Sequence, residues 1–152
     1  DFTSLVTEPQ LLFVYPDENI EILDADIMPM TDGRYCMTYC AQENPGGIKM
    51  AISEHINRGY VYQPQQIDVE PRSCEAPTMY KIIGQDKWLL MYDIFSIRPH
   101  NFGFMETTDF KTFRSFGHFG DGPTKRDGFA EQKHGAVTHI TEEDAKRLES
   151  YW

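Results

Sequence analysis

Hydrophobic residues along the chain occur in short alternating or continuous runs, and polar clusters rich in Gly, Pro, Asn and Asp separate these runs. Short runs bounded by turn-forming residues are typical of β-strands, whereas amphipathic helices need longer stretches with a period of 3.6. We therefore predict an all-β protein. Its strands are expected near residues 11–14, 23–30, 34–41, 47–53, 60–63, 76–82, 86–93, 100–106, 111–116 and 135–140.

The pattern of these runs also repeats once along the chain. The segment DADIMPMTDGRYCMTYC is followed later by the similar segment EAPTMYKIIGQDKWLLMYD. The matched positions, at offsets of 51 to 54 residues, are Asp24 with Glu75, Tyr35 with Trp88, Ser53 with Thr107 and Ile56 with Phe110. A period of this size indicates a propeller, a solenoid or a repeated array, and the alternation within each copy favours propeller blades.

Each copy carries a turn signal at the same place. Thr31-Asp32-Gly33 separates two apolar runs in the first copy, and Gly84-Gln85-Asp86 takes the matching place in the second. Such turns join antiparallel neighbours. Each unit is therefore predicted to be a four-stranded antiparallel meander, with bounds of about 20–65 and 72–117.

The remainder of the chain departs from the repeat. Residues 117–133 are polar and rich in glycine, which predicts a long surface loop, and 134–152 are expected to hold a final strand and a short C-terminal helix capped by Thr141 and Asp144. Residues 1–152 then form a single partial propeller domain of about two and a half blades. Closed propellers have roughly four to eight blades, so we expect an upstream segment or a second chain to complete the ring.

Charge and composition limit the ligands. The formal net charge is −10, which repels phosphate groups, so neither nucleic acid nor an anionic membrane surface is expected as a partner. No stretch approaches the roughly 20 apolar residues that a membrane span needs. The three cysteines, Cys36, Cys40 and Cys74, lack the CxxC spacing of a zinc site and are interpreted as buried free thiols.

The candidate chemistry lies in carboxylates at the beginnings of the predicted units. Asp24 and Asp26 are two residues apart in an extended run and so share a face, while Glu75 opens the matching strand of the next unit. Equivalent strands of neighbouring blades begin near one axis, so these acids can face one pocket. Paired carboxylates of this kind carry out glycoside hydrolysis, although acids at strand ends are more often solvated or bonded to loops.

Three stretches resemble the second half of a five-bladed propeller glycosidase of glycoside hydrolase family 43. They are ILDADIMPMTDGRYCMTYC, SCEAPTMYKIIGQDKWLLMYD and FAEQKHGAVTHITEEDAKRL, and the similarity spans roughly residues 20–149. The resemblance implies that Glu75, in Glu75-Ala76-Pro77, is the general acid. It implies that Asp24, nine residues before Gly33, positions the acid and tunes its pKa, with Asp26 as the alternative for that role.

The same resemblance assigns further contacts. His134, followed by Gly135, is expected at the start of the last blade, facing the central channel near the sugar and beside a cation or water. We therefore predict no required cofactor but a calcium ion that His134 could help to hold. Asp93 could bond to sugar hydroxyls or tie a loop, and Arg98 could line the pocket or lie in a solvated hairpin tip. Lys133 replaces an Arg that often precedes this His.

By this resemblance the expected function is inverting hydrolysis of plant-type polysaccharides or oligosaccharides such as xylosides or arabinosides, in an extracellular or periplasmic location. The family's catalytic base, an Asp on the first blade, has no convincing counterpart in this sequence. The alternatives are a non-catalytic carbohydrate-binding propeller, an inactive fragment without the base, and a repeat scaffold that binds protein.

Overall fold

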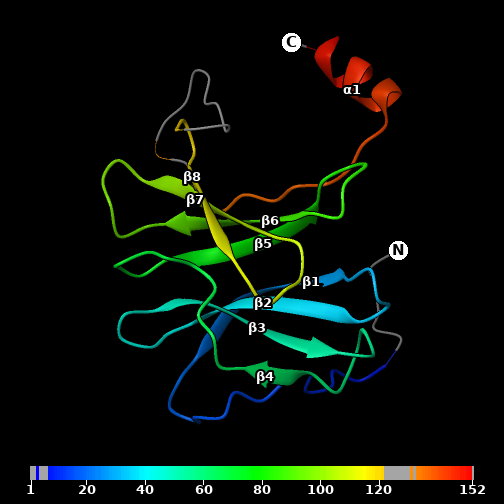
Figure 1. Ribbon diagram of the computed structural model, residues 1–152. Helices are drawn as coiled ribbons and strands as arrows, with labels where there is room; N and C mark the ends of the chain where they lie inside the picture. Colours follow the sequence, from blue (N-terminus) through cyan, green and yellow to red (C-terminus); the bar gives the residue numbers. More distant parts are fainter. Residues whose placement is uncertain (1–2, 4–6, 122–130, 132, 152) are drawn as a thin grey trace.

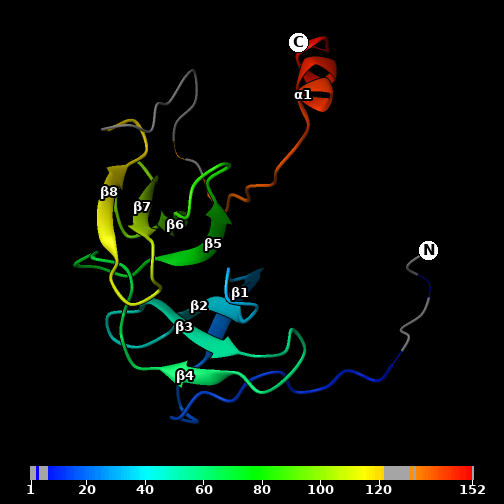
Figure 2. The same ribbon diagram turned by 45° about the vertical axis from the view of Figure 1, so that its right-hand side comes forward.

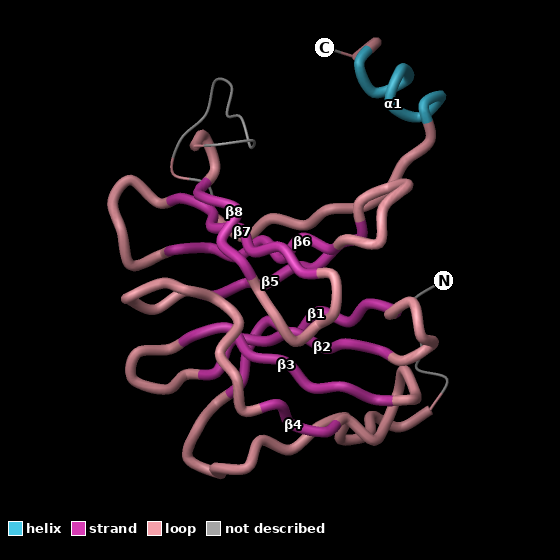
Figure 3. The backbone as a smooth tube through the Cα atoms, in the orientation of Figure 1, coloured by secondary structure: helices cyan, strands magenta, loops and turns pink. Residues whose placement is uncertain are grey.

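The computed structural model describes residues 3, 7–121, 131 and 133–151, and within them the chain is all-β apart from one short helix (Figures 1 and 3). The strands form two separate four-stranded sheets. The first sheet contains β1 (Ile22–Pro29), β2 (Tyr35–Ala41), β3 (Gly47–Ser53) and β4 (Val61–Gln63). The second contains β5 (Glu75–Lys81), β6 (Trp88–Ile94), β7 (Asn101–Thr107) and β8 (Arg114–His118).

Both sheets are simple antiparallel meanders, in which each strand pairs with the next one along the chain. The predicted turns join the first two strands of each sheet. Gly33 and Gly84 adopt φ values of 87° and 77°, in the left-handed region where glycine carries no steric penalty. The two repeat units are confirmed as meanders.

The sheets pack against each other through one face each (Figure 2). Alternation along β2 sends Cys36 and Cys40 into the core between the sheets, and Met37 and Tyr39 to the opposite face. Trp88 is 1 % exposed in this core, where its ring lies against that of Phe110. The three cysteines are free and buried, as expected, and burial raises the pKa of the Cys36 thiol to about 12.

The first strand of each sheet is interrupted at the same place. In β1 the pairing with β2 shifts between Leu23 and Asp26, and in β5 the pairing with β6 shifts between Glu75 and Thr78. Each interruption is a β-bulge, in which two residues of the first strand lie opposite one residue of its neighbour.

The bulges correct the alignment of the two repeats. The residues with positive φ are Asp24 (54°) in the first bulge and Ala76 (48°) in the second, so these two are structural equivalents. Glu75 corresponds to Leu23. The match of Asp24 with Glu75 was therefore wrong by one position, because aligning acid with acid ignored the backbone conformation that each residue adopts.

Two predicted strands are absent from the described structure. Residues 11–14 form no strand; instead Phe13 and Tyr15 pack on the outer face of the first sheet. Residues 135–140 also form no strand, although the His139 ring lies 2.8 Å from the carbonyl oxygen of Lys81. Both segments have a strand-like sequence but pair with no described strand, and a strand requires a partner for its backbone. Much of the predicted loop 117–133 lies outside the described residues.

The predicted C-terminal helix is present as α1 (Glu142–Glu149) and stands away from the sheets (Figure 1). The Thr141 hydroxyl accepts a hydrogen bond from the Asp144 N–H at 3.0 Å, as the capping pattern predicted. None of its side chains is buried. In the described part of the chain, no helix has the length and apolar character needed to cross a membrane.

Candidate active site

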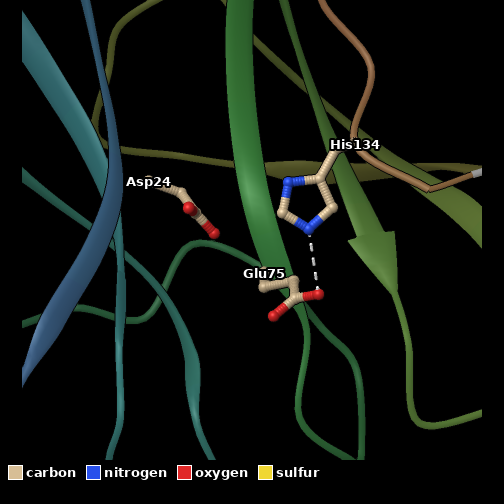
Figure 4. A group of neighbouring side chains, drawn as sticks. All are labelled: Asp24, Glu75 and His134. Atoms are coloured by element: carbon tan, nitrogen blue, oxygen red, sulfur yellow. Dashed lines mark hydrogen bonds and ion pairs between the residues drawn. The ribbon is translucent and has the colours of Figure 1, made fainter.

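Three side chains from different parts of the chain meet where β1 and β5 begin (Figure 4). Asp24 comes from β1, Glu75 from the first position of β5, and His134 from the segment that follows the second sheet. One ligand atom of each lies within 4.8 Å of the others. The predicted convergence of Asp24, Glu75 and His134 is therefore present.

The bulge in β5 determines where Glu75 points. In a regular strand Glu75 and Met79, four residues apart, would share a face, and Met79 lies in the core between the sheets. The bulge instead places Glu75 opposite Asp93, on the other face of the second sheet. One extra residue therefore turns the acid out of the hydrophobic core and toward Lys133 and His134.

The two aspartates of β1 both bond to the backbone of β5. Asp24 Oδ2 accepts from the Ala76 N–H at 3.1 Å, and Asp26 Oδ2 accepts from the Met79 N–H at 2.8 Å. Their predicted common direction is confirmed by these contacts. Asp26 bonds to Met79, further along β5, whereas Asp24 bonds to the residue that follows Glu75. Asp24 is therefore the better placed of the two to influence Glu75. A sugar contact by Asp26 stays a prediction.

Two cationic or polar groups hold the carboxylate of Glu75. Lys133 Nζ lies 2.9 Å and His134 Nε2 3.1 Å from the same oxygen, Oε1. Partial burial raises the pKa of Glu75, but the hydrogen bonds and charges of Lys133 and His134 outweigh it and hold this pKa below its usual value. Glu75 is therefore ionised near neutral pH in this arrangement.

Asp93 forms a second, buried acid behind Glu75. Its side chain is 0 % exposed, and neither oxygen has a partner with good hydrogen-bond geometry in the described part of the chain. The nearest charge is Lys133 Nζ, 3.6 Å from Oδ2. Burial is the main cause that raises the pKa of Asp93, and the attraction of Lys133 and the nearby N–H of His134 only partly offset it.

Asp93 lies within β6, has no exposed surface and is covered on one side by Lys133. A sugar contact by Asp93 stays a prediction. Arg98 is exposed, and its guanidinium donates to the carbonyl oxygens of Phe95 and Ile97, each at 2.9 Å. Its contacts lie within its own loop, and its role in substrate binding stays a prediction.

The cluster is a poor match for calcium. Calcium takes six to eight oxygen ligands, whereas this group offers two carboxylates and one imidazole nitrogen. The ammonium of Lys133 already bonds to Glu75 Oε1 and would repel a metal ion at that oxygen. The donor set therefore does not fit the calcium ion expected from the resemblance.

Sequence reasoning gave Lys133 no role, yet it joins Glu75 to Asp93. The sequence feature that points to a role for Lys133 is its position directly before His134. This feature could not be interpreted without knowing that Glu75 and Asp93 are cross-strand neighbours, and that pairing depends on the bulge.

The chain is similar to known glycoside hydrolases. A family model described as "Probable glycosyl hydrolase domain", related to glycoside hydrolase family 43, matches residues 1–146. The chain belongs to this family. The match covers both sheets, the three clustered residues and the first part of α1.

Two solved structures share the fold of this family 43-related chain. Both are of bacterial proteins assigned as glycoside hydrolases. The one from Bacteroides ovatus aligns with a TM-score of 0.57 and 15 % identity over 70 % of this chain and 34 % of its own. The one from Parabacteroides distasonis aligns with a TM-score of 0.57 and 14 % identity over 70 % and 35 %. The chain thus spans about a third of the length of these structures. A search of curated proteins found no match.

Proposed function

We propose that this family 43-related chain takes part in hydrolysing glycosidic bonds of plant-type polysaccharides or oligosaccharides, of the xyloside or arabinoside type, with inversion of configuration. The observation that carries the proposal is the meeting of Asp24, Glu75 and His134 within 4.8 Å, brought about by matching bulges in two sheets. Glu75 is the proton donor, Asp24 its neighbouring charge and His134 a contact for the sugar.

In the proposed reaction Glu75 gives its proton to the glycosidic oxygen as the bond from that oxygen to the anomeric carbon breaks. A water molecule attacks the same carbon from the opposite face and loses a proton to a base. Inverting enzymes keep the acid and base roughly 6.5–9.5 Å apart to admit this water. Asp24 is closer than that to Glu75, so it serves as a modulator, and the base is not assigned to a described residue.

The proton donor must be protonated before it acts, and Lys133 opposes this. We propose that a bound substrate displaces the ammonium from Glu75 toward Asp93, which is already 3.6 Å away. Losing the cation raises the pKa of Glu75, because a nearby positive charge favours the ionised carboxylate. The buried Asp93 would then keep Lys133 in place.

A non-catalytic carbohydrate-binding domain is the second candidate. The ionised state of Glu75 and its two partners favour it, since a carboxylate held by Lys133 and His134 accepts hydrogen bonds from sugar hydroxyls without donating a proton.

Both candidates place the two sheets as blades of a five-bladed propeller. The support is the repeated meander and the likeness to solved structures of which this chain spans about a third. An upstream segment or a second chain would supply the other blades and the base.

The test is hydrolysis of xylan- and arabinan-derived oligosaccharides, followed by NMR to read the configuration of the first product. The chain is assayed alone and within the longest natural protein that contains it. Glu75→Gln is expected to lower the rate by about 10²–10⁴-fold, the usual contribution of a general acid. Asp86→Asn, at an exposed acid in the β5–β6 turn, is the matched control. Saccharide binding without turnover would support the second candidate, and retention of configuration would exclude inversion.

A further inference from the structure

A row of cross-strand neighbours crosses the outer face of the second sheet, the face turned away from the first sheet. Glu75 of β5 lies opposite Asp93 of β6, and Asp93 lies opposite Phe102 of β7. Met91, two residues before Asp93, shares this face because side chains alternate along a strand. The row therefore has an acidic end, at Glu75 and Asp93, and an apolar end, at Phe102 and Met91.

Two residues anchor the following segment over this row, one on each side of His134. Before it, Lys133 Nζ lies 2.9 Å from Glu75 Oε1 and 3.6 Å from Asp93 Oδ2. After it, Gly135 lies directly on the apolar end of the row. His134 is thus placed between an electrostatic anchor and a packing anchor.

The packing anchor requires a residue without a side chain. A β-carbon at position 135 would lie 2.7 Å from the terminal methyl carbon of Met91 and 3.2 Å from Cζ of Phe102. Non-bonded carbon atoms prefer about 3.5–4.0 Å. The flexible end of Met91 can yield in part, but the ring of Phe102 is rigid and both residues are buried. Glycine at position 135 therefore lets the backbone come this close to the sheet.

The backbone at His134 bends in a way that residues with a β-carbon adopt rarely. Its φ is 48°, in the left-handed region, and such a conformation persists where the surrounding structure holds it. The imidazole leaves this bend toward the acid, with Nε2 3.1 Å from Glu75 Oε1 (Figure 4). We infer that Gly135 is a positioning residue, whose close packing on the sheet holds His134 in the bend that directs its imidazole at Glu75.

The consequence for catalysis rests on the proposed function, in which His134 contacts the sugar beside the proton donor. A side chain at position 135 would lift the segment from the sheet and carry the imidazole away from Glu75. A misplacement of about 1 Å in a catalytic arrangement can lower a rate by roughly 10²-fold. Because residue 135 lies outside the described strands, this displacement is expected to leave both sheets in place.

The test adds side chains of increasing size at position 135 and follows the His134 imidazole by NMR. Gly135→Ala is expected to shift the ring signals, and Gly135→Val to shift them further, because the added carbons meet Met91 and Phe102. His134 is one cause of the lowered pKa of Glu75, so this pKa should rise in the same order. In the longest natural protein that contains the chain, Gly135→Val should lower the hydrolysis rate about 10- to 100-fold.

A second substitution provides the rescue. Met91→Leu removes the terminal methyl carbon that the new β-carbon would meet. Combined with Gly135→Ala, it should return the His134 signals toward those of the wild type, a response that a role in stability alone would not produce. Ala136→Ser, at the exposed next residue, also adds one heavy atom and is the matched control. Thermal unfolding of each variant shows whether it is folded.

Unchanged His134 signals and an unchanged Glu75 pKa in Gly135→Ala and Gly135→Val overturn the inference, whatever the hydrolysis assay shows. Equal shifts in Ala136→Ser overturn it as well. If Gly135→Val does not fold, Gly135→Ala and its rescue decide. A displaced imidazole in a protein whose wild type hydrolyses no saccharide keeps the positioning role and rejects the catalytic proposal.

Discussion

The two sheets use the same backbone device for different purposes. Both first strands carry a bulge with a non-glycine residue in the left-handed region, Asp24 in β1 and Ala76 in β5. In the first sheet the bulge residue is itself the acid, and it bonds across to Ala76 of the other sheet. In the second sheet the bulge residue is a small alanine, and its effect is to turn the preceding Glu75 out of the core. The comparison shows that the same backbone feature can join the two sheets in one copy and direct the carboxylate of the candidate site in the other.

The largest effect on stability is expected at the deeper of the two contacts between β1 and β5. Asp26→Ala removes the carboxylate that accepts from the Met79 N–H and leaves this part-buried donor without its charged partner. Hydrogen bonds to charged groups contribute about 1.5–3 kcal/mol, and we expect a loss of that size in the free energy of unfolding. Chemical denaturation measures it. Asp17→Ala is the control, because the exposed Asp17 side chain bonds only to nearby Asn19 in the described structure. Equal losses in both variants would contradict the anchoring role.

Glycine at the two bulge positions should have opposite effects. Ala76→Gly relieves a left-handed conformation that costs roughly 1–2 kcal/mol, partly offset by glycine's extra freedom in the unfolded chain, so a gain of up to about 1 kcal/mol is expected. Asp24→Gly relieves the same strain but loses the bond to the Ala76 N–H, and it should be neutral or destabilising. Thermal unfolding of the two variants decides this, and a stabilisation of the same size at both sites would show that the Asp24 carboxylate anchors nothing.

Much of this fold could be predicted from the sequence because it depends on local patterns. Thr31-Asp32-Gly33 and Gly84-Gln85-Asp86 marked the hairpins, and Thr141 with Asp144 marked the start of α1. Residues 11–14 and 135–140 were misassigned because their patterns are strand-like, whereas strand formation depends on a partner for the backbone.

The residues of the candidate site could be predicted more fully than their geometry. Asp24, Glu75 and His134 were recognised through motifs, and the structure brings them together. The bulges were not foreseen, since a single extra residue leaves the hydrophobic pattern almost unchanged but reverses the face of each residue before it. For that reason the register of Glu75 with Asp93, and the bridging position of Lys133, could not be obtained from the sequence.

The most direct test of this account is the pKa of Glu75, measured by carboxyl-carbon NMR in the wild-type chain and in Lys133→Ala. The control is Lys111→Ala, which removes an exposed charge between β7 and β8, at the opposite end of the sheets. Because the folded-state pKa of Glu75 is lowered, its ionised form stabilises the fold above the unfolded-state value of roughly 4.3, and this stabilisation is lost as the pH falls through the folded-state pKa.

We predict that Glu75 titrates below the usual value in the wild type and in Lys111→Ala, that Lys133→Ala raises its pKa, and that Lys133→Ala loses less stability on acidification. A wild-type Glu75 that titrates like a free glutamate and does not respond to Lys133→Ala would contradict the claim that the β5 bulge turns this acid toward Lys133 and His134.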